Sequence, residues 1–179
     1  MDDRPPRAAQ PGYGPRVSRA KKRKLVAGLV AHVESEIATM RKAALDAAEG
    51  ATHEEAKPEN DKDTRAIEAS YLAAGQAERV RQMDASVKML ARLELLELTK
   101  TTPISATAVV TLEDDDGVQT TFLLLPHFGG VVLELDGKKV QVVTPPSPLG
   151  AALLGRTQGE VIELRAKAGK RELTIVAVW

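Results

Sequence analysis

The sequence predicts an α+β protein, in which an N-terminal antiparallel two-helix coiled-coil hairpin precedes a C-terminal β-rich domain. Apolar residues first recur at alternating spacings of three and four, which is typical of packed helices. An acidic segment with a proline at 58 interrupts this pattern, and after Pro103 the pattern changes to the short alternating runs and turn dipeptides of strands. We therefore divide the 179 residues into a tail (1–16), a hairpin (17–100) and a domain (104–179).

Composition excludes several classes of function. The chain has no cysteine and three scattered histidines, which excludes disulfides and thiolate metal sites and argues against structural zinc. Aromatic residues make up 3%, too few for the aromatic lining usual in enzyme pockets. No apolar run approaches the roughly 20 residues of a membrane span, and no secretory signal is evident. We expect a cytoplasmic protein without membrane contact.

The N-terminal tail is basic although the formal net charge of the chain is zero. Residues 1–24 hold eight basic and two acidic side chains, a net charge of +6. Prolines and charges in 1–16 predict disorder, because such a segment buries too little apolar surface to offset its ordering entropy. The tail is interpreted either as a solvated extension or as a segment that contacts nucleic acid electrostatically.

Two long helices are predicted on either side of the acidic segment. The first starts near Val17 and ends at Gly50, and the second runs from Arg65 to Leu98. Because helices of similar length joined by a short loop pack as an antiparallel pair, the turn is expected near residue 58 or 59. One chain can satisfy both heptad seams, so a monomer is expected. The predicted seam residues are Val26, Val30, Val33, Ile37, Met40, Ala44 and Ala47 in the first helix, and Val80, Met83, Val87, Leu90, Leu93 and Leu96 in the second.

The tip of this hairpin, near 53–63, is predicted to be acidic. A cluster of carboxylates on a loop is most often a solvated surface, so the cluster alone does not assign a function. His53 has no second histidine four residues on, which excludes a zinc-protease helix. The candidate functional acids of the tip are Glu55, Glu59, Asp61 and Asp63.

The C-terminal domain is predicted to hold six strands and one short helix. Asp136-Gly137 between two alternating runs is the strongest hairpin signal. Ser147 is a predicted helix N-cap with Pro148 in the first turn. The predicted strands are Ala106–Leu112, Thr120–Leu125, Val131–Leu135, Lys139–Val143, Val161–Leu164 and Glu172–Val178, and the predicted helix is Leu149–Leu154.

The run Thr144-Pro-Pro-Ser-Pro-Leu-Gly-Ala-Ala-Leu-Leu-Gly155, followed by Gly159-Glu-Val and Gly169-Lys-Arg-Glu, resembles the C-terminal signature of the GreA/GreB family. The stretch Asn60–Gln76 is similar to the tip and descending helix of Gre factors, above all to a divergent Gre-like branch with a THEE-x-K-x-EN-x-x-DTR-x-x-EASYLA pattern. The resemblance covers roughly 20–179.

This resemblance implies a coiled-coil finger joined to an FKBP-like domain. It implies a transcription elongation factor that binds bacterial RNA polymerase: the finger enters the secondary channel, and the globular domain docks at its rim, with Ser147, Pro148, Leu149 and Gly150 as candidate contacts. The chain would have no cofactor of its own. Its tip acids would help the polymerase to hold a second Mg²⁺, with Glu55 and Glu59 as candidate ligands, and to cleave backtracked RNA.

The register of the acidic pair stays open. Anchored on Glu59-Asn60, the family's two acid positions fall on Ala56 and Glu59, with Glu55 one residue out of place. Anchored instead on the Tyr71-Leu-Ala-Ala segment, the positions fall on Thr64 and Ile67, with Asp63 and Glu68 as displaced substitutes. Hairpin geometry favours the first register.

Other functions remain as alternatives. A non-cleaving regulator or inhibitor of the same channel fits the imperfect acidic pair. A peptidyl-prolyl isomerase or chaperone would need an aromatic-lined pocket, for which the domain offers only Phe122, Phe128 and Trp179. A coiled-coil adaptor is the third alternative. The protein is expected not to be an enzyme itself, and at most to stimulate the intrinsic cleavage activity of the polymerase.

Overall fold

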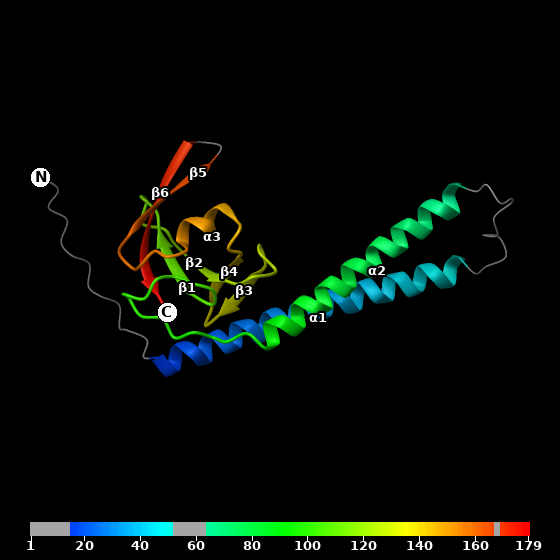
Figure 1. Ribbon diagram of the computed structural model, residues 1–179, viewed down its shortest axis with the longest axis horizontal. Coiled ribbons are helices and arrows are strands. Elements are labelled where there is room, and N and C mark those ends of the chain that lie inside the picture. The colour runs from blue at the N-terminus through cyan, green and yellow to red at the C-terminus, as the bar shows by residue number, and fades with distance from the viewer. Residues whose placement is uncertain (1–14, 52–63, 167–168) are drawn as a thin grey trace, which may run out of the picture. The chain divides into compact units, whose positions relative to one another are not determined.

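The computed structural model describes residues 15–51, 64–166 and 169–179, and the predicted α+β fold is confirmed (Figure 1). The chain divides into two compact units, which are described separately: one is Val26–Leu93, and the other combines the chain up to Leu25 with Glu94–Trp179. We call them the hairpin unit and the sheet unit. The elements are α1 (Pro15–Ala51), α2 (Thr64–Ala91), β1 (Val109–Glu113), β2 (Gln119–Leu124), β3 (Val132–Leu135), β4 (Lys138–Val143), α3 (Pro148–Leu153), β5 (Val161–Ala166) and β6 (Gly169–Val178).

The start of α1 differs from the prediction by two residues. Pro15 and Arg16, assigned to the disordered tail, are already helical. A proline is favoured in the first helical turn because its missing N–H has no intrahelical partner there and its fixed φ suits the helix. Residues 1–14 lie outside the described part of the chain.

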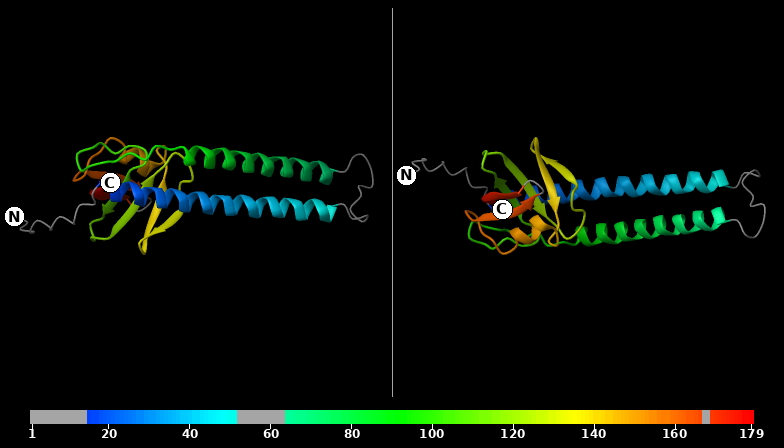
Figure 2. Two further views of the ribbon diagram at one scale, coloured as in Figure 1. Left: turned by 90° about the horizontal axis from the view of Figure 1, so that it is seen from below. Right: turned by 90° about the horizontal axis from the view of Figure 1, so that it is seen from above.

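In the hairpin unit α1 and α2 run alongside each other (Figure 2). Their predicted seam is buried over part of its length: Val33 and Ile37 of α1 and Val87 and Leu90 of α2 are buried, and Arg41 pairs with Asp84 across the helices at 2.9 Å. Towards residues 51 and 64 the burial fades. The predicted seam residue Ala44 is exposed, and so are the large apolar residues Leu45, Ile67, Tyr71 and Leu72.

Helix α2 ends at Ala91, whereas the heptad pattern predicted that it would continue to Leu98. The last turn tightens, with Arg92 donating its N–H to the Met89 carbonyl at 3.1 Å. No proline or glycine marks this end, so the sequence carries no local stop signal.

Beyond the end of α2, hydrogen bonds of the Leu96 backbone fix the path of the chain. Its N–H donates to Thr107 Oγ1 at 3.0 Å, and its carbonyl accepts from Lys22 Nζ at 2.7 Å. These tertiary bonds replace helical ones. Leu95 is consequently buried, whereas Leu96, predicted to continue the seam, is 40% exposed.

The sheet unit contains one six-stranded sheet in the order β3-β4-β2-β1-β6-β5. All neighbouring pairs are antiparallel except β2 and β4, which run parallel with Leu124 opposite Val143. Each predicted strand is present, with ends shifted by a few residues. The Asp136-Gly137 turn joins β3 to β4, and both residues have positive φ, as this two-residue turn requires.

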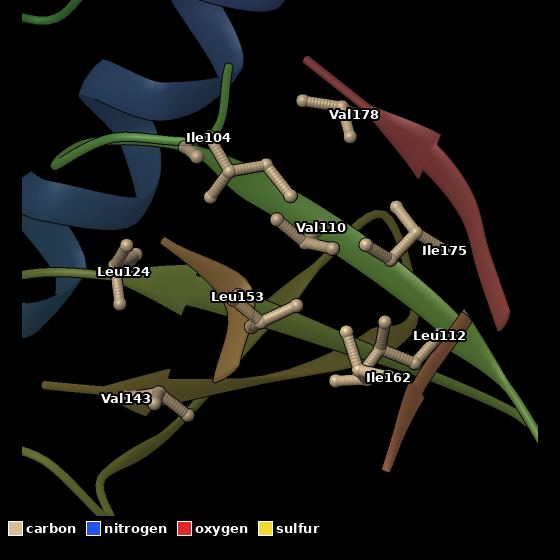
Figure 3. Packing of buried hydrophobic residues seen from close by; sticks show 10 residues of the cluster. Ile104, Val110, Leu112, Leu124, Val143, Leu153, Ile162, Ile175 and Val178 are labelled. Atoms are coloured by element: carbon tan, nitrogen blue, oxygen red, sulfur yellow. The ribbon is translucent and has the colours of Figure 1, made fainter. Parts of the chain in front are cut away.

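One hydrophobic cluster forms the core of this domain (Figure 3). Helix α3, predicted from its Ser-Pro start, contributes Leu153, which is fully buried. Such a side chain loses all its exposed apolar surface, so it stabilises the fold by about 2 kcal/mol. The buried members of the cluster are Ile104, Ala108, Val110, Leu112, Leu124, Val143, Leu153, Ile162, Ile175 and Val178.

Within the described residues, neither long helix is apolar enough over a sufficient length to cross a bilayer.

Candidate functional site

The predicted acidic tip falls outside the described residues. Glu55, Glu59, Asp61 and Asp63 all belong to 52–63, so both registers of the acidic pair stay predictions. On the described side, α2 begins at Thr64.

Two large apolar side chains near the start of α2 are exposed. Ile67 is 52% exposed and Tyr71 is 76% exposed. Tyr71 therefore lies outside the buried seam, and its side chain is accessible to solvent. Among the described residues no group of three histidines and carboxylates is placed to hold a metal ion.

The second candidate site, Ser147–Gly150, is fully described. Ser147 has an extended backbone, and its Oγ accepts the Gly150 N–H at 3.1 Å and donates to the Thr144 carbonyl at 2.7 Å. Pro148 occupies the first position of α3. The predicted cap is confirmed, and it holds the preceding loop and the helix in one rigid turn.

Position 150 requires a glycine, because the backbone of Thr144 lies very close to its Cα. A Cβ at this position would collide with the Thr144 carbonyl oxygen and carbon. Because the obstacle is main chain, it cannot rotate away as a side chain would. The four candidate contact residues therefore differ in role: Pro148 is exposed and Ser147 and Leu149 are half-buried, whereas Gly150 is buried and shapes the turn.

Lys22 is a residue of the sheet unit that the sequence interpretation missed. Its side chain is fully buried, and its Nζ donates to the Leu96 carbonyl at 2.7 Å. Burial lowers the pKa of Lys22 to about 8, against the opposing attraction of Glu97. Desolvation outweighs the nearby carboxylate because a buried ammonium loses most of its hydration. A signal was present in the sequence: Lys22 precedes the buried Leu25 and Leu29 by three and seven residues, and so shares their face of α1.

Thr107 is the second residue that bonds to the backbone of Leu96. Thr107 is buried and has φ +71, a left-handed conformation that is costly for a β-branched residue. That conformation lets its N–H donate to the Leu124 carbonyl at 2.7 Å while its Oγ1 accepts from Leu96. Thr107 and Lys22 together anchor the segment at Leu96 to the sheet and to the first turns of α1.

A second contact joins α1 to the sheet at the β3–β4 turn. Lys21 Nζ lies 2.6 Å from Asp136 Oδ2. The hydrogen bond from Lys21 lowers the pKa of Asp136, and the charge of Lys24 lowers it further. Both groups are partly in solvent, so this ion pair adds little to the stability of the sheet unit.

Comparison with known proteins agrees with this architecture. Residues 99–179 match the family model for "Transcription elongation factor, GreA/GreB, C-term". The "Transcription inhibitor protein Gfh1" of Thermus thermophilus is 32% identical over 113 residues, which cover 61% of this chain and 70% of that protein. The chain belongs to the GreA/GreB family of transcription factors. Factors of this family are not enzymes themselves.

Solved structures of this family are also similar to the chain. The crystal structure of Thermus aquaticus Gfh1 shares 26% identity, covering 85% of this chain and 94% of that one, with a TM-score of 0.38. A GreA/GreB elongation factor from Nitrosomonas europaea shares 24% identity, covering 54% and 78%, with a TM-score of 0.34.

Proposed function

We propose that this Gre-family factor binds bacterial RNA polymerase at the secondary channel, with the helical hairpin entering the channel and the C-terminal domain docking at its rim. Family membership supports the proposal, and the capped turn at Ser147–Gly150 provides a rigid surface for the docking step. The exposed Pro148 is the part of this turn that is free to meet a partner.

The length of the helices is compatible with this role. Helix α1 has 37 residues, so at 1.5 Å per residue it extends about 55 Å, and α2 with 28 residues extends about 42 Å. The apolar residues that remain exposed near residues 45 and 67–72 would then lie inside the channel. A hairpin that acts inside a partner has less need of a continuous apolar seam at that end.

Two consequences of channel binding are candidates. In the first, Glu55 and Glu59 supply oxygen ligands to the second Mg²⁺ of the polymerase and the factor stimulates cleavage of backtracked RNA. In the second, the factor occupies the channel without promoting cleavage and inhibits transcription. The name of the Thermus thermophilus relative, a transcription inhibitor, favours the second.

A cleavage assay on stalled, backtracked elongation complexes separates the two. The wild type is compared with the double variant Glu55→Ala/Glu59→Ala and with Asp63→Ala, and binding to the complex is measured in parallel. Intact RNA with bound wild-type factor assigns the inhibitor role. Cleavage lost in only one of the variants assigns the cleavage role and the register of the acids together.

Binding itself is tested by retention of the protein on immobilised core RNA polymerase. Pro148→Ala is expected to weaken retention, whereas Val118→Thr, an exposed residue of the β1–β2 turn, should leave it unchanged. Failure of the wild type to bind would refute the proposal and favour the adaptor alternative. The basic residues of the tail (1–16) are proposed to add contact with nucleic acid, which predicts that binding to the transcribing complex weakens more steeply with salt than binding to core enzyme.

A further inference from the structure

The parallel pairing of β2 and β4 brings two loops to one edge of the sheet. Strands that run parallel end at the same edge, so the loop 125–131 after β2 and the loop 144–147, which leads from β4 into α3, start side by side. Leu125 donates its N–H to the Val143 carbonyl at 2.9 Å, which continues the pairing to the end of both strands. Gly130 then returns to β4, donating to the Val142 carbonyl at 2.8 Å.

Thr144 joins the two loops into one surface. A Cβ at Gly129 would lie 3.0 Å from Thr144 Cγ2, so the first loop approaches the second as closely as a glycine allows. On its other side the Thr144 carbonyl accepts both the N–H of Ser147, at 3.0 Å, and its hydroxyl. The result is one surface whose two halves both contact Thr144. We call it the paired-loop surface and define it by Pro126, His127, Phe128, Pro146 and Pro148.

This surface is apolar and partly exposed. Its three prolines are exposed, and His127 and Phe128 are half-buried, with their rings edge to face at 6.3 Å between centroids. Phe128 also has φ +62, a backbone conformation that favours glycine or asparagine. The backbone conformation therefore does not favour an aromatic residue here, and contacts of the side chain must account for it: the half-buried part of the ring packs on His127, and the exposed part is available to a partner.

The surface is also free of charge in a highly charged chain. Charged residues make up 28% of the sequence, yet none occurs in 117–133 or in 140–155, the stretches that contain both loops. The centres of protein–protein interfaces are depleted in charged residues and enriched in aromatic ones. Burial in the core explains the lack of charge at strand residues such as Leu123 and Val142, but not at the exposed Pro126, Pro146 and Pro148. A partner that covers these exposed positions would account for it.

We infer that the paired-loop surface, with Phe128 as its aromatic contact, docks on an uncharged, apolar patch of RNA polymerase and extends the contact made by Ser147–Gly150. This inference rests on the proposed function. It adds the loop after β2, which neither the family resemblance nor the sequence pattern assigned to a contact. The occupant is a protein surface rather than nucleic acid, because the surface carries no lysine or arginine to meet phosphates.

The test is the affinity of the full-length protein for core RNA polymerase, measured for the wild type, Phe128→Asn and Phe128→Gly. Both replacements suit a left-handed backbone, which offsets the loss of the half-buried ring, so the thermal stability is expected to stay close to that of the wild type. The dissociation constant is expected to rise about tenfold or more, as for loss of an aromatic contact at the centre of an interface. Two replacements are used so that a folding defect in one of them leaves the test intact.

Val118→Thr is the matched control. Val118 is likewise an exposed apolar residue of this domain. It precedes β2 and therefore lies at the other end of that strand, about 20 Å from the paired-loop surface. It should bind as the wild type does. If the wild type binds and the folded Phe128 variants bind equally well, the inference is overturned while the proposed function stands. If the wild type does not bind, the proposed function itself fails.

Discussion

The two units of this protein are stabilised in different ways. The sheet unit has a three-dimensional core, in which ten buried residues from five strands, α3 and the segment before β1 pack into one cluster. The hairpin unit has only the seam between two helices, and the seam is buried at Ile37 and Val87 but exposed at Ala44. A seam contacts neighbours along one line, so each of its residues has fewer apolar partners than a residue in a packed cluster.

This difference indicates where cooperative stability lies. Segments with few buried apolar contacts open at a lower free energy than the global unfolding of the chain. The end of the hairpin near residues 51 and 64 therefore depends on local helix propensity, which the alanine-rich start of α2 provides. Trp179, the single tryptophan, pairs with Val109 in the sheet unit, so its fluorescence reports that unit, whereas the helical circular dichroism signal is dominated by α1 and α2.

The largest effect is expected from Leu153→Ala in the sheet core. Removal of this fully buried side chain should lower the free energy of unfolding by about 3 kcal/mol, within the usual 2–5. Urea unfolding followed by Trp179 fluorescence measures it. The neighbouring Leu154, 42% exposed, is the matched control, and Leu154→Ala should cost less than about 0.5 kcal/mol. Equal losses from the two leucines would contradict the assigned core.

A smaller and separable effect is expected from Ile37→Ala in the hairpin seam. This residue is 3% exposed, and its truncation should destabilise the hairpin by about 2 kcal/mol. The midpoint of the helical signal should fall while that of Trp179 fluorescence stays in place. Leu45→Ala, at a 60% exposed position of the same helix, should move neither. A joint shift of both midpoints would show that the two units unfold as one.

The smallest effect is a pH dependence that arises from Lys22. Its folded-state pKa is lowered to about 8, from an ordinary value of 10.5. The unfolded chain therefore binds more protons than the folded one between these values, and stability rises with pH in that window. Between pH 8 and pH 9.5 the gain should be on the order of 1.5 kcal/mol. In Lys22→Met this gain should be absent, whereas the exposed Lys24→Met should keep it. A wild type and Lys22→Met that respond equally to pH would show that Lys22 does not titrate in this range.

Much of the fold was predictable because its signals are local. Alternation and the Asp136-Gly137 turn located the strands, and Ser147 with Pro148 located α3, since caps and turns depend on a few neighbouring residues. The end of α2 was not predictable in this way. The heptad pattern continues through Leu96, and only its hydrogen bonds to Lys22 and Thr107 divert the chain.

In the candidate site, too, the features with a local sequence signal were predictable and those set by tertiary contacts were not. The Ser147–Gly150 turn was predicted from the sequence, and its capping geometry is confirmed. The sequence did not link the loop with His127 and Phe128 to this turn, because the parallel pairing of β2 with β4 joins residues that have no common motif. The tip acids remain predictions of the sequence.

The sequence by itself therefore determined the order of the elements, the family and the capped turn, since periodicity, turn chemistry and a contiguous motif are all properties of short segments. Tertiary structure alone decided the strand order, the burial of Lys22, the end of α2 and the surface that joins Phe128 to Pro148. Each of these depends on residues far apart in the chain, whose pairing is set by packing and hydrogen bonds rather than by any pattern in one segment.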